Sequence, residues 1–122
     1  MNFKIGSGRT SLTYTAVFHG DDLHLHIDGG CSHIGSVTAA FGERVETVTF
    51  PGHKESLLTE SVAKHLALAL GGRVVVTAGV HLDGITKSEI ERIVAQNVTM
   101  AERLPLLLQK EGNRDENRLS EQ

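Results

Sequence analysis

The spacing of apolar residues divides this chain into a first half with a period of two and a second half with a helical period. Residues 9–19 and 23–28 alternate apolar with polar side chains, and Gly20-Asp21-Asp22 separates them, which predicts a β-hairpin. The β-branched runs 33–42 and 44–50 predict two further antiparallel strands.

The helical period begins after Pro51. Apolar residues recur every three or four positions between Leu57 and Leu70, and Gly71-Gly72 marks the end of this predicted helix. The run 73–78 predicts a well-covered inner strand. A capping box, Thr86-Lys87-Ser88-Glu89, opens a second predicted helix, which we expect Pro105 to end or kink.

The resulting order, ββββαβα, predicts an α+β fold. We expect a two-layer domain, a mostly antiparallel β-meander with two helices packed on one face. We expect residues 1–110 to form this single domain. Residues 111–122 are charged and almost free of apolar side chains, which predicts a disordered C-terminal tail.

Composition narrows the class of partner and the compartment. The net charge of −3 provides no basic stripe, and an aromatic content of 4% provides few stacking surfaces, so we expect no nucleic-acid partner. A single cysteine, Cys31, excludes an intramolecular disulfide and fits a reducing, cytoplasmic location. We also expect no membrane association, because no segment has the length and hydropathy of a bilayer span.

Three histidines beside glycines stand at breaks between predicted elements. His53 and Lys54 are predicted in the first turn of a helix, where free amides and two cationic side chains would favour an anion such as phosphate. Gly52 would allow close backbone approach to that anion. The alternative for Lys54 is a side chain that extends into solvent with its charge offset by Glu55.

The other two breaks carry His33 and His81. His81 and Asp83 form an H-x-D pair between Gly79 and Gly84, which either contributes to a ligand site or organises the loop before the capping box. The presence of three such histidines favours a shared site.

Other polar groups are interpreted as structural. His24, His26 and Asp28 share a strand face, which we interpret as the polar, solvent-facing side of an edge hairpin. Cys31 has no orienting group and is expected to be an inert or partly buried thiol. The chain lacks zinc-finger spacing, nucleotide-binding glycine loops and nucleophile motifs, so we expect no catalytic residue and no resident metal.

Four motifs carry a resemblance to a known family. They are Ser32-His33-Ile34-Gly35, Pro51-Gly52-His53-Lys54-Glu55, Ala78-Gly79-Val80-His81-Leu82-Asp83 and Ile85-Thr86-Lys87-Ser88-Glu89-Ile90. Together they resemble the LpdD-like family of prenylated-flavin chaperones associated with UbiD-type decarboxylases, whose fold is similar to that of proteasome assembly chaperones. The resemblance covers about residues 10–100.

The resemblance implies a homodimeric, non-catalytic protein that holds prenylated FMN, or FMN, and helps deliver it to a UbiD-type decarboxylase. Placing the physical argument on the matching motifs gives a candidate cofactor site of His33, Gly35, Gly52, His53, Lys54, Gly79, His81 and Asp83. Two alternatives remain open. One is a protein-assembly chaperone with no small ligand, and the other is a small metal-dependent enzyme that uses His33, His53, His81 and Asp83.

Overall fold

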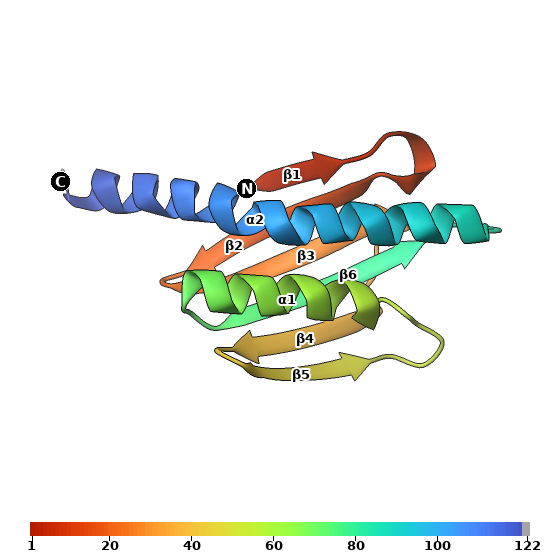
Figure 1. Ribbon diagram of the computed structural model, residues 1–122, viewed down its shortest axis with the longest axis horizontal. Coiled ribbons are helices and arrows are strands. Elements are labelled where there is room, and N and C mark those ends of the chain that lie inside the picture. Colours follow the sequence, from red (N-terminus) through yellow and green to blue (C-terminus); the bar gives the residue numbers. More distant parts are fainter. Residues whose placement is uncertain (121–122) are drawn as a thin grey trace.

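The chain forms two layers, a six-stranded sheet and two helices that lie side by side over one of its faces (Figure 1). The computed structural model describes the backbone of residues 1–120 and the side chains of residues 1–109. The strands are β1 (Asn2–Ile5), β2 (Leu12–His19), β3 (Asp22–Gly30), β4 (Ser36–Phe41), β5 (Arg44–Thr49) and β6 (Val74–His81), and the helices are α1 (Ser56–Leu70) and α2 (Lys87–Ser120). The predicted α+β class is confirmed.

The order of strands across the sheet is β1-β2-β3-β6-β4-β5. β6 pairs parallel with β3 and antiparallel with β4, and every other pairing is antiparallel. The four predicted strands therefore form two hairpins with β6 inserted between them, and the expected inner position of β6 is confirmed. β1 is an additional strand that the sequence pattern does not predict, because its four residues are too few to show a clear alternation.

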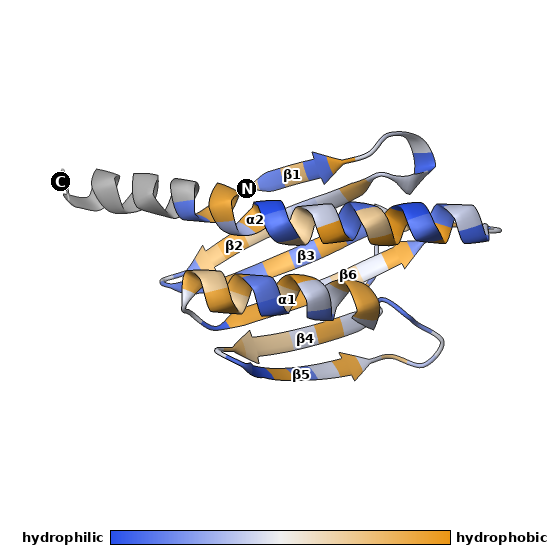
Figure 2. Cartoon of the chain, viewed as in Figure 1, coloured by the Kyte–Doolittle hydropathy of each residue, from blue (hydrophilic) through white to orange (hydrophobic). Residues whose placement is uncertain are grey.

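The core lies between the sheet and the helices. Figure 2 shows the apolar positions recurring along the strands and along both helices. Alternate residues of β2, β3, β4 and β6 point toward α1 and α2, so one sheet face is buried and the other is not covered by any helix of the described residues. The largest fully buried side chains of this core are Tyr14, Leu12, Leu25, Ile27, Leu66, Leu104 and Leu108.

The start of α2 and the end of α1 lie where their local sequence signals predict them. The Glu89 amide donates to Thr86 Oγ1 at 3.1 Å, and the Thr86 amide donates to Glu89 Oε1 at 3.0 Å, which confirms the capping box. Gly71 ends α1 with a φ of 75°, a left-handed conformation in which glycine is least strained.

α2 continues through Pro105 rather than ending there. Proline removes one helical hydrogen bond, at a cost of about 3 kcal/mol. Leu104 and Leu108, on either side of it, are fully buried, and their packing offsets that cost.

Apolar residues recur at helical spacing along α2, and only some of them are buried. Ile93 and Leu104 are buried, whereas Ile90, Val94 and Val98 form an exposed row at a spacing of four residues. The core of one chain therefore does not account for this row.

The last residues of the chain are predicted to form a tail. The predicted tail, 111–122, lies outside the residues whose side chains are described, so its boundary stays a prediction.

Within the described residues, no helix combines the length and the hydropathy that a bilayer crossing requires.

Candidate functional site

Three segments far apart in sequence meet at one end of the sheet. His33 lies in the loop between β3 and β4, His53 in the turn before α1, and His81 at the end of β6. The ring centroids of His33 and His53 are 5.2 Å apart, and those of His33 and His81 are 6.5 Å apart. The three predicted histidines therefore do gather in one place.

The prediction that His53 and Lys54 occupy the first helical turn is wrong, because α1 begins at Ser56. Pro51 and Gly52 form a tight turn, closed by a 3.1 Å bond from the His53 amide to the Phe50 carbonyl. Gly52 has a φ of 81°, which suits the third position of a type II turn and delays the start of the helix.

Glu55, at the N-cap of α1, is the residue that the sequence analysis missed. Its side chain is only 7% exposed, and Oε1 lies 3.1 Å from His33 Nε2 and 3.4 Å from His53 Nδ1. The Val80 amide also donates to Oε1, at 3.4 Å. The negative charge expected from a ligand is thus present in the protein itself. The H-x-E spacing of His53 and Glu55 is the sequence pattern that could have pointed to Glu55 as a member of this cluster.

The hydrogen bonds of this cluster shift the pKa values of its members. Burial alone would raise the pKa of Glu55. The nearby amide of its own backbone, together with His33, His53 and the Val80 amide, favours the charged form, outweighs that penalty and holds the pKa below its ordinary value. The pKa of His33 is raised, first by the hydrogen bond between Nδ1 and the Cys31 carbonyl at 2.8 Å and then by Glu55.

Gly35 and Gly79 allow the loops to approach this closely. A Cβ atom on Gly35 would overlap the Glu55 carboxylate, and one on Gly79 would overlap the His33 carbonyl oxygen. The Gly35 amide also donates to the Ala78 carbonyl at 2.8 Å. Both glycines therefore act through close packing beneath the site.

The remaining predicted residues lie at the periphery. His81 Nε2 is 3.1 Å from Asp83 Oδ1, and both side chains are exposed. Lys54 is exposed, as is Gly52. The thiol of Cys31 is exposed too, so of the two expectations, an inert or a partly buried thiol, the second is wrong.

A cavity of about 330 Å³ opens on the uncovered face of the sheet, next to the histidine cluster. Its lining residues are His24, His26, Ser32, His33, Ile34 and Thr77. β3 is an inner strand, so the interpretation of His24 and His26 as part of an edge hairpin is wrong. These histidines form a wall of the cavity, and His26 Nδ1 lies 2.7 Å from Thr77 Oγ1.

His33 belongs both to this cavity and to the Glu55 cluster. The site offers imidazole rings as flat walls, Ile34 as an apolar contact, and imidazole nitrogens as hydrogen-bond partners. This combination suits the binding of a flat, partly polar ligand.

Comparison with known proteins gives two matches. Protein LpdD of Lactiplantibacillus plantarum is 40% identical over 78 residues, which cover 58% of this chain and 57% of that protein. This chain therefore spans a little over half the length of that curated relative. The model of the prenylated flavin chaperone LpdD-like domain matches residues 6–109, a span that includes every strand from β2 onward and all the site residues named above. The chain belongs to the LpdD-like prenylated flavin chaperone family.

Proposed function

We propose that this protein binds prenylated FMN without catalysing a reaction and assists its delivery to a UbiD-type decarboxylase in the cytoplasm. The observation that carries the proposal is the family match over residues 6–109. The histidine-lined cavity also supports the proposal, because all its lining residues lie within that span.

The cavity fits the flat part of such a ligand. Its volume, about 330 Å³, lies at the lower end of the range for small-molecule sites, so it would hold the ring system and leave the phosphate arm outside. His24, His33 and Ile34 would contact the rings, which compensates for the low aromatic content.

The phosphate would lie toward the turn before α1 in this proposal. His53 and the exposed Lys54 precede Glu55 there, and a cationic side chain attracts phosphate from solvent. His81 and Asp83 border the same end of the sheet. Gly35, Gly52 and Gly79 would act by shaping the backbone around the ligand.

We also propose that two copies associate through the uncovered face of the sheet. Val75, on the inner strand β6, is 38% exposed on this face, and Val17, Phe41 and Val48 are exposed on neighbouring strands. Such a face without helices favours cover by a second copy of the same chain. The cavity opens on this face, so the ligand would lie between the two copies or next to their contact surface.

Substitution of Lys54 tests the phosphate contact. Lys54→Ala should weaken binding of reduced prenylated FMN by roughly tenfold, because a charge-assisted bond to the phosphate is lost. The free energy of unfolding without ligand should change by less than about 0.5 kcal/mol, since Lys54 is exposed. Anaerobic titration followed by flavin absorbance measures the affinity, for the reduced and the oxidised cofactor separately.

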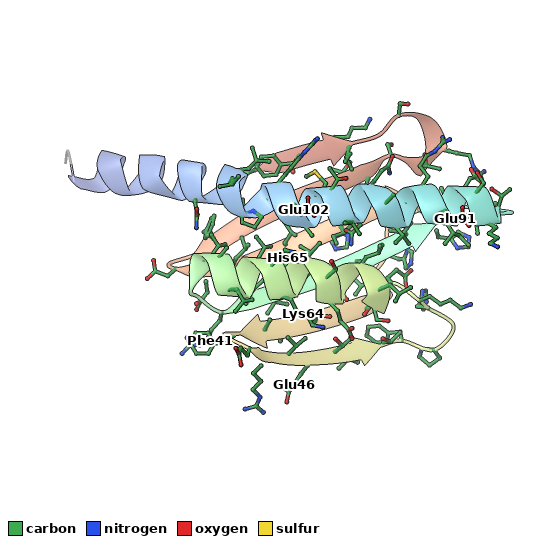
Figure 3. All side chains as sticks on the ribbon, in the orientation of Figure 1. Phe41, Glu46, Lys64, His65, Glu91 and Glu102 are labelled. Atoms are coloured by element: carbon green, nitrogen blue, oxygen red, sulfur yellow. The ribbon has the colours of Figure 1, made fainter. Side chains whose placement is uncertain are left out.

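The matched control is Lys64→Ala, another exposed lysine, on α1 (Figure 3). It should bind flavin as the wild type does. Delivery is tested by mixing the loaded protein with a purified apo-decarboxylase. Absence of saturable flavin binding by the wild type would contradict the proposed function. Equal losses in the two lysine variants would contradict the placement of the phosphate.

A further inference from the structure

The carboxylate of Glu55 is buried with one of its two oxygens unpartnered. Oε1 receives the contacts from His33, His53 and the Val80 amide, whereas Oε2 has no hydrogen-bond partner among the described residues. A buried acceptor without a partner is costly, and native proteins rarely retain one without a reason. The site thus has capacity for a further positive group.

The hydrogen bonding of His33 determines which of its nitrogens is available. Its Nδ1 lies 2.8 Å from the Cys31 carbonyl, and a carbonyl only accepts, so Nδ1 carries a hydrogen. In the neutral ring the lone pair is then on Nε2, which faces Glu55 Oε1 at 3.1 Å. Two lone pairs at that distance repel each other unless a cation lies between or beside them.

The positions of the potential ligand atoms match those around a small metal ion. One nitrogen each from His33 and His53 and one oxygen from Glu55 lie within 4.8 Å of one another. Around a tetrahedral ion with bonds of roughly 2.1 Å, neighbouring ligand atoms are about 3.4 Å apart. The two nitrogen–oxygen distances in the structure are 3.1 and 3.4 Å.

We propose that His33, His53 and Glu55 bind one divalent transition-metal ion of the zinc class, with a coordination position left open. Two imidazoles and one carboxylate are typical ligands of zinc, while calcium and magnesium prefer oxygen atoms alone. The Nδ1–H bond of His33 to a backbone carbonyl is the outer-sphere contact that such ligands usually make. His33 and His53 are 25% and 36% exposed, so an ion can reach the site from solvent.

This ligand set differs from the histidine and aspartate alternative raised by the sequence. Glu55 takes the place of His81 and Asp83, whose exposed side chains pair with each other. The proposal does not depend on flavin binding, because it rests only on these three side chains.

A proton is the competing occupant of the site. Protonated His33 would donate both ring hydrogens, to the Cys31 carbonyl and to Glu55, and would make a charged pair. In that arrangement His53 Nδ1 would donate its own hydrogen to Glu55 Oε1 at 3.4 Å, and the site would hold no metal. A measurement of metal binding separates the two occupants.

The experiment uses the full chain without a histidine tag, freed of metal by a chelator. Calorimetric titration with Zn²⁺ near neutral pH should show one ion per chain, and Mg²⁺ should not displace it. His33→Gln, His53→Gln and Glu55→Gln should each weaken binding by roughly tenfold or more. His65→Gln, an exposed histidine of α1 that makes a backbone contact with Ser61, is the matched control and should bind as the wild type does (Figure 3).

A second measurement needs no variant and therefore does not depend on how the substitutions fold. Nitrogen NMR of the histidine rings in the wild type should show shifts of His33 and His53 on addition of Zn²⁺, with His65 unchanged. The proposal is overturned if the wild type binds no stoichiometric zinc. It is equally overturned if the shifts fall on other histidines, or if folded Glu55→Gln retains wild-type affinity.

Discussion

Asn97 connects three elements through one buried side chain. It is 2% exposed, accepts a hydrogen bond from the Tyr14 hydroxyl at 2.7 Å and donates to the Leu58 carbonyl at 3.2 Å. The same burial raises the pKa of Tyr14 and keeps its hydroxyl protonated as a donor. One polar pair thereby fixes how α2 lies against β2 and α1.

Tyr14→Phe should therefore destabilise the fold by about 1–2 kcal/mol, because Asn97 Oδ1 is left buried without its donor. Urea denaturation followed by circular dichroism measures this change. Thr99→Ala, which removes an exposed contact to the Ala95 carbonyl on the same helix, should change stability by less than about 0.5 kcal/mol. An equal loss in the two variants would mean that the buried pair has no special role.

Glu55 shows what residue-level reasoning on a sequence can miss. The spacing of His33, His53 and His81 correctly indicated that they gather at one end of the sheet. It could not show that a carboxylate next to Lys54 would turn inward and meet two of them, because that depends on where α1 begins. The later start of α1, at Ser56 rather than in the turn that contains His53, decides which side chain enters the site.

At the scale of elements, the start of α2 is held by more than its capping box. The Arg9 guanidinium donates to both Glu89 carboxylate oxygens and to the Asp83 carbonyl, so it attaches the loop before β2 to this helix. The hydrogen bond from Arg9, followed by that from Thr86, lowers the pKa of Glu89 from 4.5 to about 2.

Because the folded pKa of Glu89 lies below its unfolded value, the stabilisation is present above about pH 4.5 and is lost as pH falls toward about 2. Glu89→Gln keeps an acceptor for the capping box but removes the charge. We expect its melting temperature at neutral pH to be lower by roughly 1–4 °C, with the difference vanishing near pH 2.

Thermal scans across this pH range, with Glu91→Gln as a control from the same helix turn, check the expectation (Figure 3). The control should match the wild type throughout. A deficit of Glu89→Gln that persists unchanged in acid would show that the contact is not electrostatic.

The elements themselves were largely predictable, because periods of two and of three to four residues depend on burial on one face. Their order across the sheet was not. The placement of β6 between β3 and β4 depends on contacts between residues about 50 apart in sequence, as in the pairing of Leu25 with Val76. The continuation of α2 past Pro105 likewise depends on burial of Leu104 and Leu108, which a local rule does not include.

At the scale of the whole molecule, both helices cover one face of the sheet and the cavity opens on the other. The helix side supplies the stability of the single chain through its core. The uncovered side carries His24, His26 and His33 together with exposed valines. The proposed ligand site and the proposed contact between copies therefore share one surface, and occupancy of one should affect the other.

A single substitution on that surface tests the association of copies. Val75→Lys places a charge on the inner strand β6 of the uncovered face, where burial against a second copy would desolvate it without a partner. We expect the wild type to sediment as a dimer at micromolar concentration and Val75→Lys to sediment at its monomer mass of 13.2 kDa. Leu57→Lys is the matched control, since Leu57 is 68% exposed on α1, on the helix layer. If Leu57→Lys dissociates the dimer and Val75→Lys does not, the contact between copies lies on the helices instead. If the wild type itself sediments as a monomer, the proposed association is wrong.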